Sequence, residues 1–405
     1  MEGLSADGCC TASTRVADNT GMLRCADVLR LSALALLGIG VLAVHSAGMN
    51  LYAEPGDASG AARWLGMFAS KHTALAVLAA VTMLLASQFD AASWLSRRNG
   101  ANPLLYALPV AVALCAVVLV PGVGVEVNGA KRWLAIPGTS LSFQPSEVMK
   151  WTLLAALAAW CGKRSERMGS FFQGLLPAGL LIALGCGLIL TEDLGTAVLL
   201  GGVSLIVVVA GGAKLLHLAP FVLGGLAATT AGIVSSEYRM RRLTAFLDPW
   251  ADPAGSGYHP IQSMLSFAQG GVTGSGLGQS VQKYHVPEET TDFILPVLSE
   301  ELGFAGVAAV VGLYLALLWA GLAAAGKRED AVGRLLCLGV VLMVATQAAI
   351  NLAVVTVVVP TKGIALPLVS AGGTGWVLTA AAIGAVAGTA RAAERKSESL
   401  IADVT

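Results

Sequence analysis

The carboxylates of this chain gather in one short stretch of sequence. Residues 284–303 read YHVPEETTDFILPVLSEELG and contain five of the 25 acidic residues, namely Glu288, Glu289, Asp292, Glu300 and Glu301. The stretch leads into a hydrophobic run, and carboxylates at a membrane boundary are costly to desolvate. Groups placed at that cost handle protons, bind cations or contact a substrate, so we expect the chemistry of the chain here.

Basic side chains form a second set on the loops outside the hydrophobic runs. They are Lys131 and Arg132 in a GAKRW setting, Arg239, Arg241 and Arg242 at the start of a long loop, and Lys362 in PTKG. Guanidinium groups pair bidentately with phosphate oxygens, which favours binding of a diphosphate. Contact with anionic lipid headgroups is the alternative interpretation.

The elements that position these groups are predicted by composition. The chain has 405 residues, of which 56% are hydrophobic and 12% charged, whereas a soluble domain carries roughly 25% charged residues. This composition is typical of a polytopic α-helical membrane protein. A net charge of zero indicates no bulk attraction to nucleic acid. The seven cysteines lack metal-ligand spacing, so neither a metal site nor a disulfide framework is expected.

Hydropathy predicts an all-α membrane domain over residues 31–391 with about ten spans. They are 31–52, 73–89, 103–121, 146–162, 174–191, 194–212, 216–236, 300–325, 332–358 and 374–391. Residues 1–30 and 392–405 are interpreted as cytoplasmic tails, since lysine and arginine are more numerous on the side that the two tails share. Segments 122–146 and 237–299 then lie outside.

The outer loop 237–299, between the seventh and eighth spans, is far longer than an ordinary connection, and such loops are functional or disordered. Two Asp-Pro pairs in DPWADP predict turns, and residues 261–269 read as a short amphipathic helix at the interface. Five glycines between 270 and 278 allow tight turns. We therefore expect an ordered, re-entrant loop.

Five blocks of sequence resemble the SEDS proteins, the FtsW/RodA/SpoVE family of bacterial cell-wall polymerases. In order, the blocks are NGAKRWL with FQPSE (128–147), DLGTA (193–197), YRMRRLTAFLDPWADPAGSGYHPIQS (238–263), GLGQSVQKYHVPEETTDFILPVLSEELGFAG (276–306) and NLAVVTVVVPTKGIALPLVSAGG (351–373). The resemblance covers nearly all of the chain after residue 30. The SVQK and PTKG stretches are closest to the FtsW/SpoVE branch.

The resemblance implies an activity. Members of this family polymerise glycan strands from lipid II on the outer face of the bacterial cytoplasmic membrane and release undecaprenyl diphosphate. Transfer is inverting, so one base suffices and no covalent intermediate is needed. They work beside a class B penicillin-binding protein and, in the FtsW branch, with other division proteins at the septum. A flippase that transports lipid II and a non-catalytic scaffold of the division machinery are the alternatives.

The resemblance also implies that Asp292 is the catalytic base. From the residues alone, Thr291 and Asp292 before an apolar run are equally a helix N-cap. The chain departs from the family at Thr290, where histidine is common, and at Ala371, Thr374 and Gly375. The departure at residue 290 removes a second proton carrier near Asp292.

The remaining candidates have two interpretations each. Glu147 is either an acid complementing the start of a helix or a contact in a central cavity, and Gln144 and Ser146 are similarly ambiguous. Glu288 and Glu289 either hold a divalent cation or are solvated. At least one of Glu300 and Glu301 should face the bundle interior. Asp193 is interpreted as a solvated helix cap, and His259 as a loop hydrogen-bonder or proton carrier.

No other catalytic motif is present. The sequence contains no P-loop, HExxH, GxSxG or DxD run in its loops, so ATP-driven transport is unsupported. The two halves of the chain show no internal repeat of the kind that transporters have.

Overall fold

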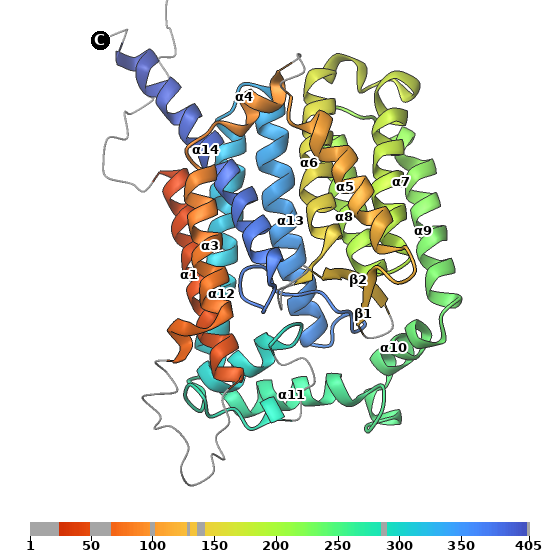
Figure 1. The fold of residues 1–405 in the computed structure, drawn as a ribbon, viewed down its shortest axis with the longest axis vertical. Coiled ribbons are helices and arrows are strands. Elements are labelled where there is room, and N and C mark those ends of the chain that lie inside the picture. Colours follow the sequence, from red (N-terminus) through yellow and green to blue (C-terminus); the bar gives the residue numbers. More distant parts are fainter. Residues whose placement is uncertain are drawn as a thin grey trace, which may run out of the picture.

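A computed structural model shows the fold as a bundle of membrane-length helices with loops gathered at its two ends (Figure 1). The structure describes residues 24–48, 66–97, 102–127, 130–135, 142–284 and 290–402. Over these residues, ten long helices correspond one to one with the ten predicted spans. They are α1 (Cys25–Ala47), α3 (Lys71–Ala86), α5 (Leu104–Val118), α6 (Pro145–Lys163), α7 (Leu176–Leu190), α8 (Leu194–Ala210), α9 (Ala219–Val234), α12 (Ile294–Gly326), α13 (Ala331–Val355) and α14 (Thr374–Ala402).

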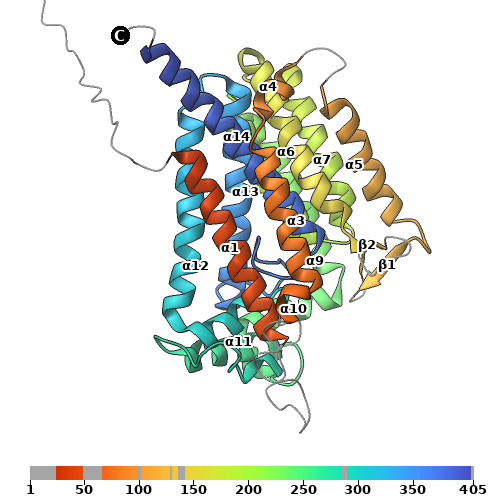
Figure 2. The same cartoon turned by 60° about the vertical axis from the view of Figure 1, so that its left-hand side comes forward.

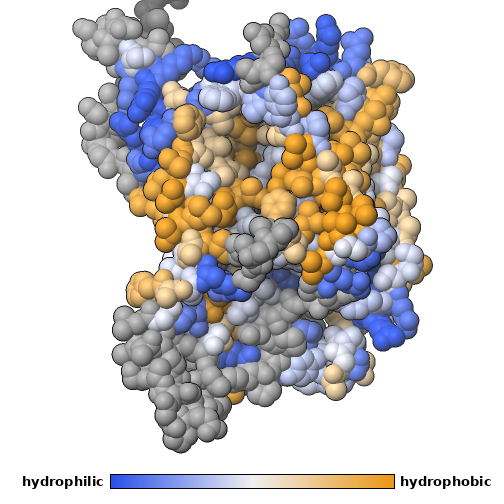
Figure 3. All heavy atoms as spheres, in the orientation of Figure 1, coloured by the Kyte–Doolittle hydropathy of each residue, from blue (hydrophilic) through white to orange (hydrophobic). Residues whose placement is uncertain are grey.

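On the visible face, an apolar band crosses the middle of the molecule and separates two hydrophilic ends (Figure 3). Six of the described helices are long and apolar enough to cross a membrane, and three more are shorter apolar helices. Exposed apolar side chains lie along their outer faces, among them Leu84, Leu223 and Leu315. In a soluble protein such a belt would be an interaction surface, whereas here it matches the hydrocarbon core of a bilayer.

Helices far apart in sequence form the centre of the bundle. α14 packs along α3 and α1, α12 packs on α1 and α13, and α13 packs on α6 and α8 (Figure 2). The start of α1 and the end of α14 lie at the same end of the bundle, whereas α10 (Glu237–Leu247) and α11 (Tyr258–Gly270) lie at the other (Figure 1). We call the end that carries α10 and α11 the loop end.

Three helix boundaries differ from the prediction by six residues or more, and the first is the start of α1, at Cys25 rather than residue 31, within the predicted tail. α12 begins at Ile294, before the predicted residue 300, and α14 continues to Ala402, beyond residue 391. The extra turns of α14 carry ion pairs to other elements: Glu394 to Lys327, Lys396 to Glu329, and Glu398 to Arg24. These contacts extend the last helix past the apolar run that hydropathy detects.

A small antiparallel sheet joins α5 to α6, which the all-α prediction did not include. Its strands are β1 (Gly124–Val127), β2 (Ala130–Ala135) and β3 (Ser142–Phe143), in the order β1-β2-β3. A β-bulge shifts the register between Val125 and Glu126. The sheet lies on the loop-end side of α6 and presents Lys131 and Arg132 on β2 (Figure 1).

The described parts of the long loop, residues 237–284 and 290–299, form helices and defined turns, as expected. α11 occupies the predicted amphipathic segment, and positive φ angles at Gly271, Gly274, Gly276 and Gly278 form the turns after it. α12 is broken at Gly303, whose φ of 66° and ψ of −167° are not helical. A side chain at Gly303 would collide with Gly274, since its Cβ would lie 2.4 Å from the Gly274 nitrogen. The first part of α12 therefore packs against the glycine turns.

The second half of the segment between α13 and α14, residues 364–370, is largely buried although it is not helical. Leu366, Leu368 and Val369 are at most 2% exposed. The backbone passes so close to α1 that a Cβ at Gly40 would lie 2.6 Å from the Leu368 carbonyl oxygen. Side chains supply hydrogen bonds that a helix would have made, with Tyr314 donating to Pro367 and Trp376 to Ser370. Non-helical backbone at membrane depth requires such partners.

Candidate active site

Asp292 lies in the turn immediately before α12 at the loop end, with its side chain half-buried. The N-cap position of α12 is Phe293, which makes no side-chain cap hydrogen bond. The alternative of an Asp292 N-cap is therefore wrong. The carboxylate instead lies against Gly363, where an added Cβ would be 2.7 Å from Asp292 Oδ2.

Two further contacts fasten the Asp292 turn to the segment that carries Lys362. Asn351 Nδ2, on α13, donates to the Asp292 carbonyl at 3.0 Å and to the Ile364 carbonyl at 2.8 Å. The Ala371 amide donates to the Thr290 carbonyl at 2.8 Å. The last bond joins backbone atoms, so it does not depend on which side chains stand at residues 290 and 371.

Lys362 faces the carboxylate of Asp193. Burial lowers the pKa of Lys362 below its ordinary value of 10.5, and the Asp193 charge opposes that shift. Asp193 caps α8 by accepting from the Thr196 amide at 3.0 Å and its hydroxyl at 2.8 Å. The prediction of a cap is confirmed, but the prediction that Asp193 is solvated is wrong, because the residue is 6% exposed.

Arg132 completes this corner of the site from β2. Its Nε donates to the Glu192 carbonyl at 2.9 Å, and its Nη1 lies 3.8 Å from Asp193 Oδ2. The Lys131 amide donates to Glu192 Oε2 at 2.7 Å. The sheet is thus attached to the turn between α7 and α8.

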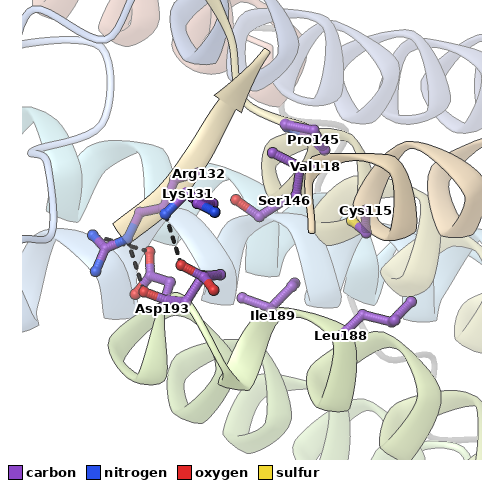
Figure 4. Close-up of a pocket in the computed structure, with 10 residues that line it drawn as sticks. Cys115, Val118, Lys131, Arg132, Pro145, Ser146, Leu188, Ile189 and Asp193 are labelled. Atoms are coloured by element: carbon purple, nitrogen blue, oxygen red, sulfur yellow. Dashed lines mark hydrogen bonds and ion pairs between the residues drawn. The ribbon is translucent and has the colours of Figure 1, made fainter. Parts of the chain in front are cut away.

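A pocket opens beside these contacts (Figure 4). It is a small, open hollow between α5, β2, α6 and the turn after α7. One wall is apolar, with Cys115, Val118, Leu188 and Ile189, and the rim is polar, with Lys131, Arg132, Ser146, Glu192 and Asp193. An apolar wall beneath a charged rim suits a lipid with an anionic headgroup.

The predicted cationic residues divide into two kinds. The arginines are engaged with backbone: Arg239 donates to Gly232 O at 2.8 Å and Thr191 O at 3.3 Å, and Arg242 to Thr361 O at 3.5 Å and to the Tyr238 hydroxyl. The Lys131 and Lys362 ammonium groups make no hydrogen bond and no ion pair within 4 Å in the described part of the chain. The lysines are therefore the cations available to a ligand, and the arginines hold the loops that carry them.

Glu147 lies inside the bundle. Its carboxylate pairs with Lys150 Nζ at 2.8 Å, one turn along α6, and lies beside Gly375 at the start of α14. Lys150 is 2% exposed and also donates to Gln347 of α13 at 3.1 Å. Gln347 in turn donates to the Ala365 carbonyl at 2.8 Å. Glu147 thus lies in the first turn of α6 and also contacts other residues inside the bundle, as in the second of its two interpretations.

Glu300 and Glu301 are both buried, so the expectation that at least one faces the interior is confirmed. Glu300 accepts from the Ser280 hydroxyl and the Val281 and Gln282 amides. Glu301 accepts from Ser46 of α1 at 2.6 Å. These partners lie on α1 and on residues 280–282, away from Lys131 and Lys362. Glu301 therefore holds the loop to α1 and does not line the pocket.

The other candidates are less informative. Gln144 occupies the N-cap position of α6 without a side-chain cap bond, and Ser146 lines the pocket. Glu288 and Glu289 fall outside the described residues. Among the described residues, no three His, Cys, Asp or Glu side chains come together as metal ligands. His259, on α11, stacks on Phe293 at 5.2 Å between ring centroids, next to Asp292 in sequence.

Three residues with clear roles in this geometry were missed from the sequence: Lys150, Gln347 and Asn351. Each is a polar residue inside a predicted span, and such residues face the bundle interior or a cavity. That signal was available for all three. Their hydrogen-bond partners could not be predicted from the sequence, because these depend on the path of the segment after α13.

Comparison with known proteins bears on the identity of this site. A family model described as a cell cycle protein, FTSW_RODA_SPOVE, matches residues 27–395. The chain belongs to the FtsW/RodA/SpoVE family. A probable peptidoglycan glycosyltransferase FtsW of Trichlorobacter lovleyi is 37% identical over 88% of this chain and 91% of the relative. Stage V sporulation protein E of Bacillus subtilis is 34% identical over 88% and 94%. These relatives place the chain in the FtsW/SpoVE branch.

Solved structures support the same membership. A chain from a peptidoglycan synthase complex that coordinates polymerization and crosslinking matches with a TM-score of 0.68 and 28% identity, over 90% of this chain and 96% of that one. The rod shape determining protein RodA of Thermus thermophilus matches with a TM-score of 0.55 and 26% identity, over 90% and 95%. The family fold therefore extends through α1 to α14.

Proposed function

We propose that this protein polymerises peptidoglycan glycan strands from lipid II by inverting glycosyl transfer, releasing undecaprenyl diphosphate. The observation that carries the proposal is the approach of Asp292 to the Lys362 segment, where the ammonium makes no described hydrogen bond. A base and an available cation are what such a transfer requires, and the family relationship supplies the substrate class.

The reaction needs one displacement. The hydroxyl of the acceptor sugar attacks the anomeric carbon of the donor, the bond from that carbon to the diphosphate oxygen breaks, and the hydroxyl proton passes to the Asp292 carboxylate. A positioned general base contributes roughly 10²–10⁴-fold to such a step.

The leaving diphosphate gathers negative charge as the bond breaks. Lys131 lies on the rim of the pocket together with Asp193, and Lys362 lies close enough to Asp193 to be affected by its charge. Cations that are fixed before the reaction stabilise developing charge without reorganisation.

We place the loop end on the outer face of the bacterial cytoplasmic membrane, with both termini inside. An even number of spans puts both termini on the same side of the membrane. In agreement with this, the start of α1 and the end of α14 lie at the same end of the bundle (Figure 1). A class B penicillin-binding protein is the proposed partner, because a structurally similar chain lies in a complex that couples polymerization to crosslinking. Membership of the FtsW/SpoVE branch supports a role at the division septum.

Purified protein in liposomes, supplied with lipid II alone and with a class B transpeptidase, tests the proposal. Long glycan strands resolved by gel electrophoresis are the expected product. Movement of lipid II between leaflets without polymer would instead support a flippase. Transpeptidase binding with neither polymer nor transport would support a scaffold.

A further inference from the structure

One buried amide connects the proposed base to the proposed cation. Asn351 is 1% exposed on α13, and its Nδ2 carries two hydrogens. One is donated to the Asp292 carbonyl and the other to the Ile364 carbonyl, two residues after Lys362. We infer that Asn351 is a positioning residue for glycosyl transfer, which sets the Asp292 turn and the Lys362 segment in one fixed relation.

The two acceptors belong to segments that have no helix of their own at this point. Asp292 lies in a turn, and Ile364 lies in the non-helical stretch between α13 and α14. Neither position is therefore fixed by regular secondary structure. A rigid helix such as α13 is a suitable reference for both, because sites built on helices hold their geometry better than sites on loops.

Neighbouring contacts connect the two Asn351 hydrogen bonds to the proposed reacting groups. The Asp292 carboxylate touches Gly363, which lies between Lys362 and Ile364. A shift of the Ile364 backbone would therefore move both the lysine and the surface against which the carboxylate rests. Gln347, one turn earlier on α13, holds Ala365 only and makes no described contact with the Asp292 turn. Asn351 is the residue that spans both.

An energetic cost accompanies this arrangement. Asn351 Oδ1 is buried without a hydrogen-bond partner among the described residues. An unsatisfied buried acceptor is unfavourable, and such groups in folded proteins call for an explanation. Two donated bonds to two carbonyls fix the amide orientation, and retention of the unpaired oxygen follows from the need for both donors.

The role of Asn351 rests on the proposed function, because Asp292 and Lys362 matter to it as reacting groups. The test uses the full-length chain with Asn351→Ala, Asn351→Ser and Asn351→Asp. Ser263→Ala is the matched control, since the buried Ser263 hydroxyl donates to the Val355 carbonyl at 2.5 Å, one turn beyond Asn351, and makes no described hydrogen bond to either segment.

Steady-state polymerisation of lipid II should separate positioning from simple stabilisation. Asn351→Ala is expected to lower kcat by about tenfold to a hundredfold, as small displacements of reacting groups do, with KM changed less than about threefold. Asn351→Ser keeps one donor and should fall between. Asn351→Asp has the same shape but no amide donors and should resemble Asn351→Ala. Ser263→Ala should lower the thermal midpoint with kcat retained.

Coupling to Lys362 gives a second readout. If Asn351 acts by placing Lys362, the losses of Asn351→Ala and Lys362→Ala should be less than multiplicative in the double variant. Fully multiplicative losses, or equal kcat losses in Asn351→Ala and Ser263→Ala at equal thermal midpoints, would overturn the inference.

Hydrogen exchange tests whether Asn351 joins the two segments, and it does not depend on polymerisation activity. Peptides over residues 290–299 and 360–370 should both exchange faster in Asn351→Ala and keep wild-type rates in Ser263→Ala. Acceleration of neither segment, or of one alone, would overturn the inference. Failure of the wild-type protein to polymerise lipid II would contradict the proposed function, and the exchange result would still decide whether Asn351 joins the two segments.

Discussion

The carboxylate of Asp292 rests against the α-carbon of Gly363. A Cβ on Gly363 would lie 2.7 Å from Asp292 Oδ2 and 3.7 Å from its Cγ. Real Cβ atoms do not approach an oxygen that closely, so any other residue at this position must move the acid. The absence of a side chain at residue 363 therefore brings the base and the Lys362 segment together.

Gly363→Ala should displace the Asp292 carboxylate and lower the rate of lipid II polymerisation by about tenfold or more, as a misplaced catalytic group does. Gly375→Ala is the matched control, because its Cβ would be 3.7 Å from Glu147, an ordinary contact distance. Initial rates of strand formation by the two variants provide the measurement. Equal rates for Gly363→Ala and Gly375→Ala would mean that displacement of the Asp292 carboxylate does not affect the reaction.

The charge of Lys362 predicts a dependence on pH. Because burial lowers its pKa below 10.5, the ammonium loses its proton at a lower pH in the folded protein than in the unfolded chain. Within that window the unfolded chain binds more protons, so stability should rise with pH while affinity for an anionic substrate falls. Lys362→Arg keeps its charge and should move the basic limb of the pH–rate profile upward.

That profile is measured as kcat/KM against pH for wild type and Lys362→Arg. A basic limb at the same pH in both proteins would show that a different group controls it. Arginine and lysine differ in shape, so the comparison uses the position of the limb rather than the absolute rate.

The Lys131 ammonium has no partner among the described residues whereas the Arg239 guanidinium has two, so we make opposite predictions for these two loop cations. Lys131→Ala should raise KM for lipid II with little change in thermal stability, because the ammonium makes no described hydrogen bond or ion pair. Arg239→Ala should lower the thermal midpoint, because it removes donors to Gly232 and Thr191. Hydrogen bonds of charged groups contribute about 1.5–3 kcal/mol. The reverse pattern would reassign the diphosphate contact to Arg239.

The buried pair of Glu147 and Lys150 should be far more sensitive to loss of one partner than of both. Lys150→Met leaves Glu147 without its cation inside the bundle, which should destabilise the fold by about 3–5 kcal/mol. Combining it with Glu147→Gln should restore much of that loss. Thermal unfolding in detergent measures both, and an additive loss in the double variant would contradict the assigned pairing.

Helix positions were predictable because apolar runs of membrane length leave few alternatives. The ten expected spans each contain a helix, from α1 to α14. The break at Gly303 was not predictable, since a glycine within an apolar run has the same local pattern whether the helix continues or turns. The sheet was missed because β1 to β3 are only two to six residues long.

The site was predictable in part. Asp292 and the basic residues followed from the family motifs and from the cost of charge at a membrane boundary. The distinction between Lys131 and Arg239 was not available, because it depends on which backbone carbonyls lie within reach of each side chain. Asn351 was likewise hidden, since its two acceptors lie 59 and 13 residues away in the chain.

The role of Asp292 as base is tested most directly by Asp292→Asn in purified, folded protein supplied with lipid II. The amide keeps the shape of the side chain but cannot accept the hydroxyl proton. Strand formation should fall by about a hundredfold or more, with lipid II binding and the thermal midpoint close to wild type. Polymerisation at the wild-type rate by Asp292→Asn would contradict this account.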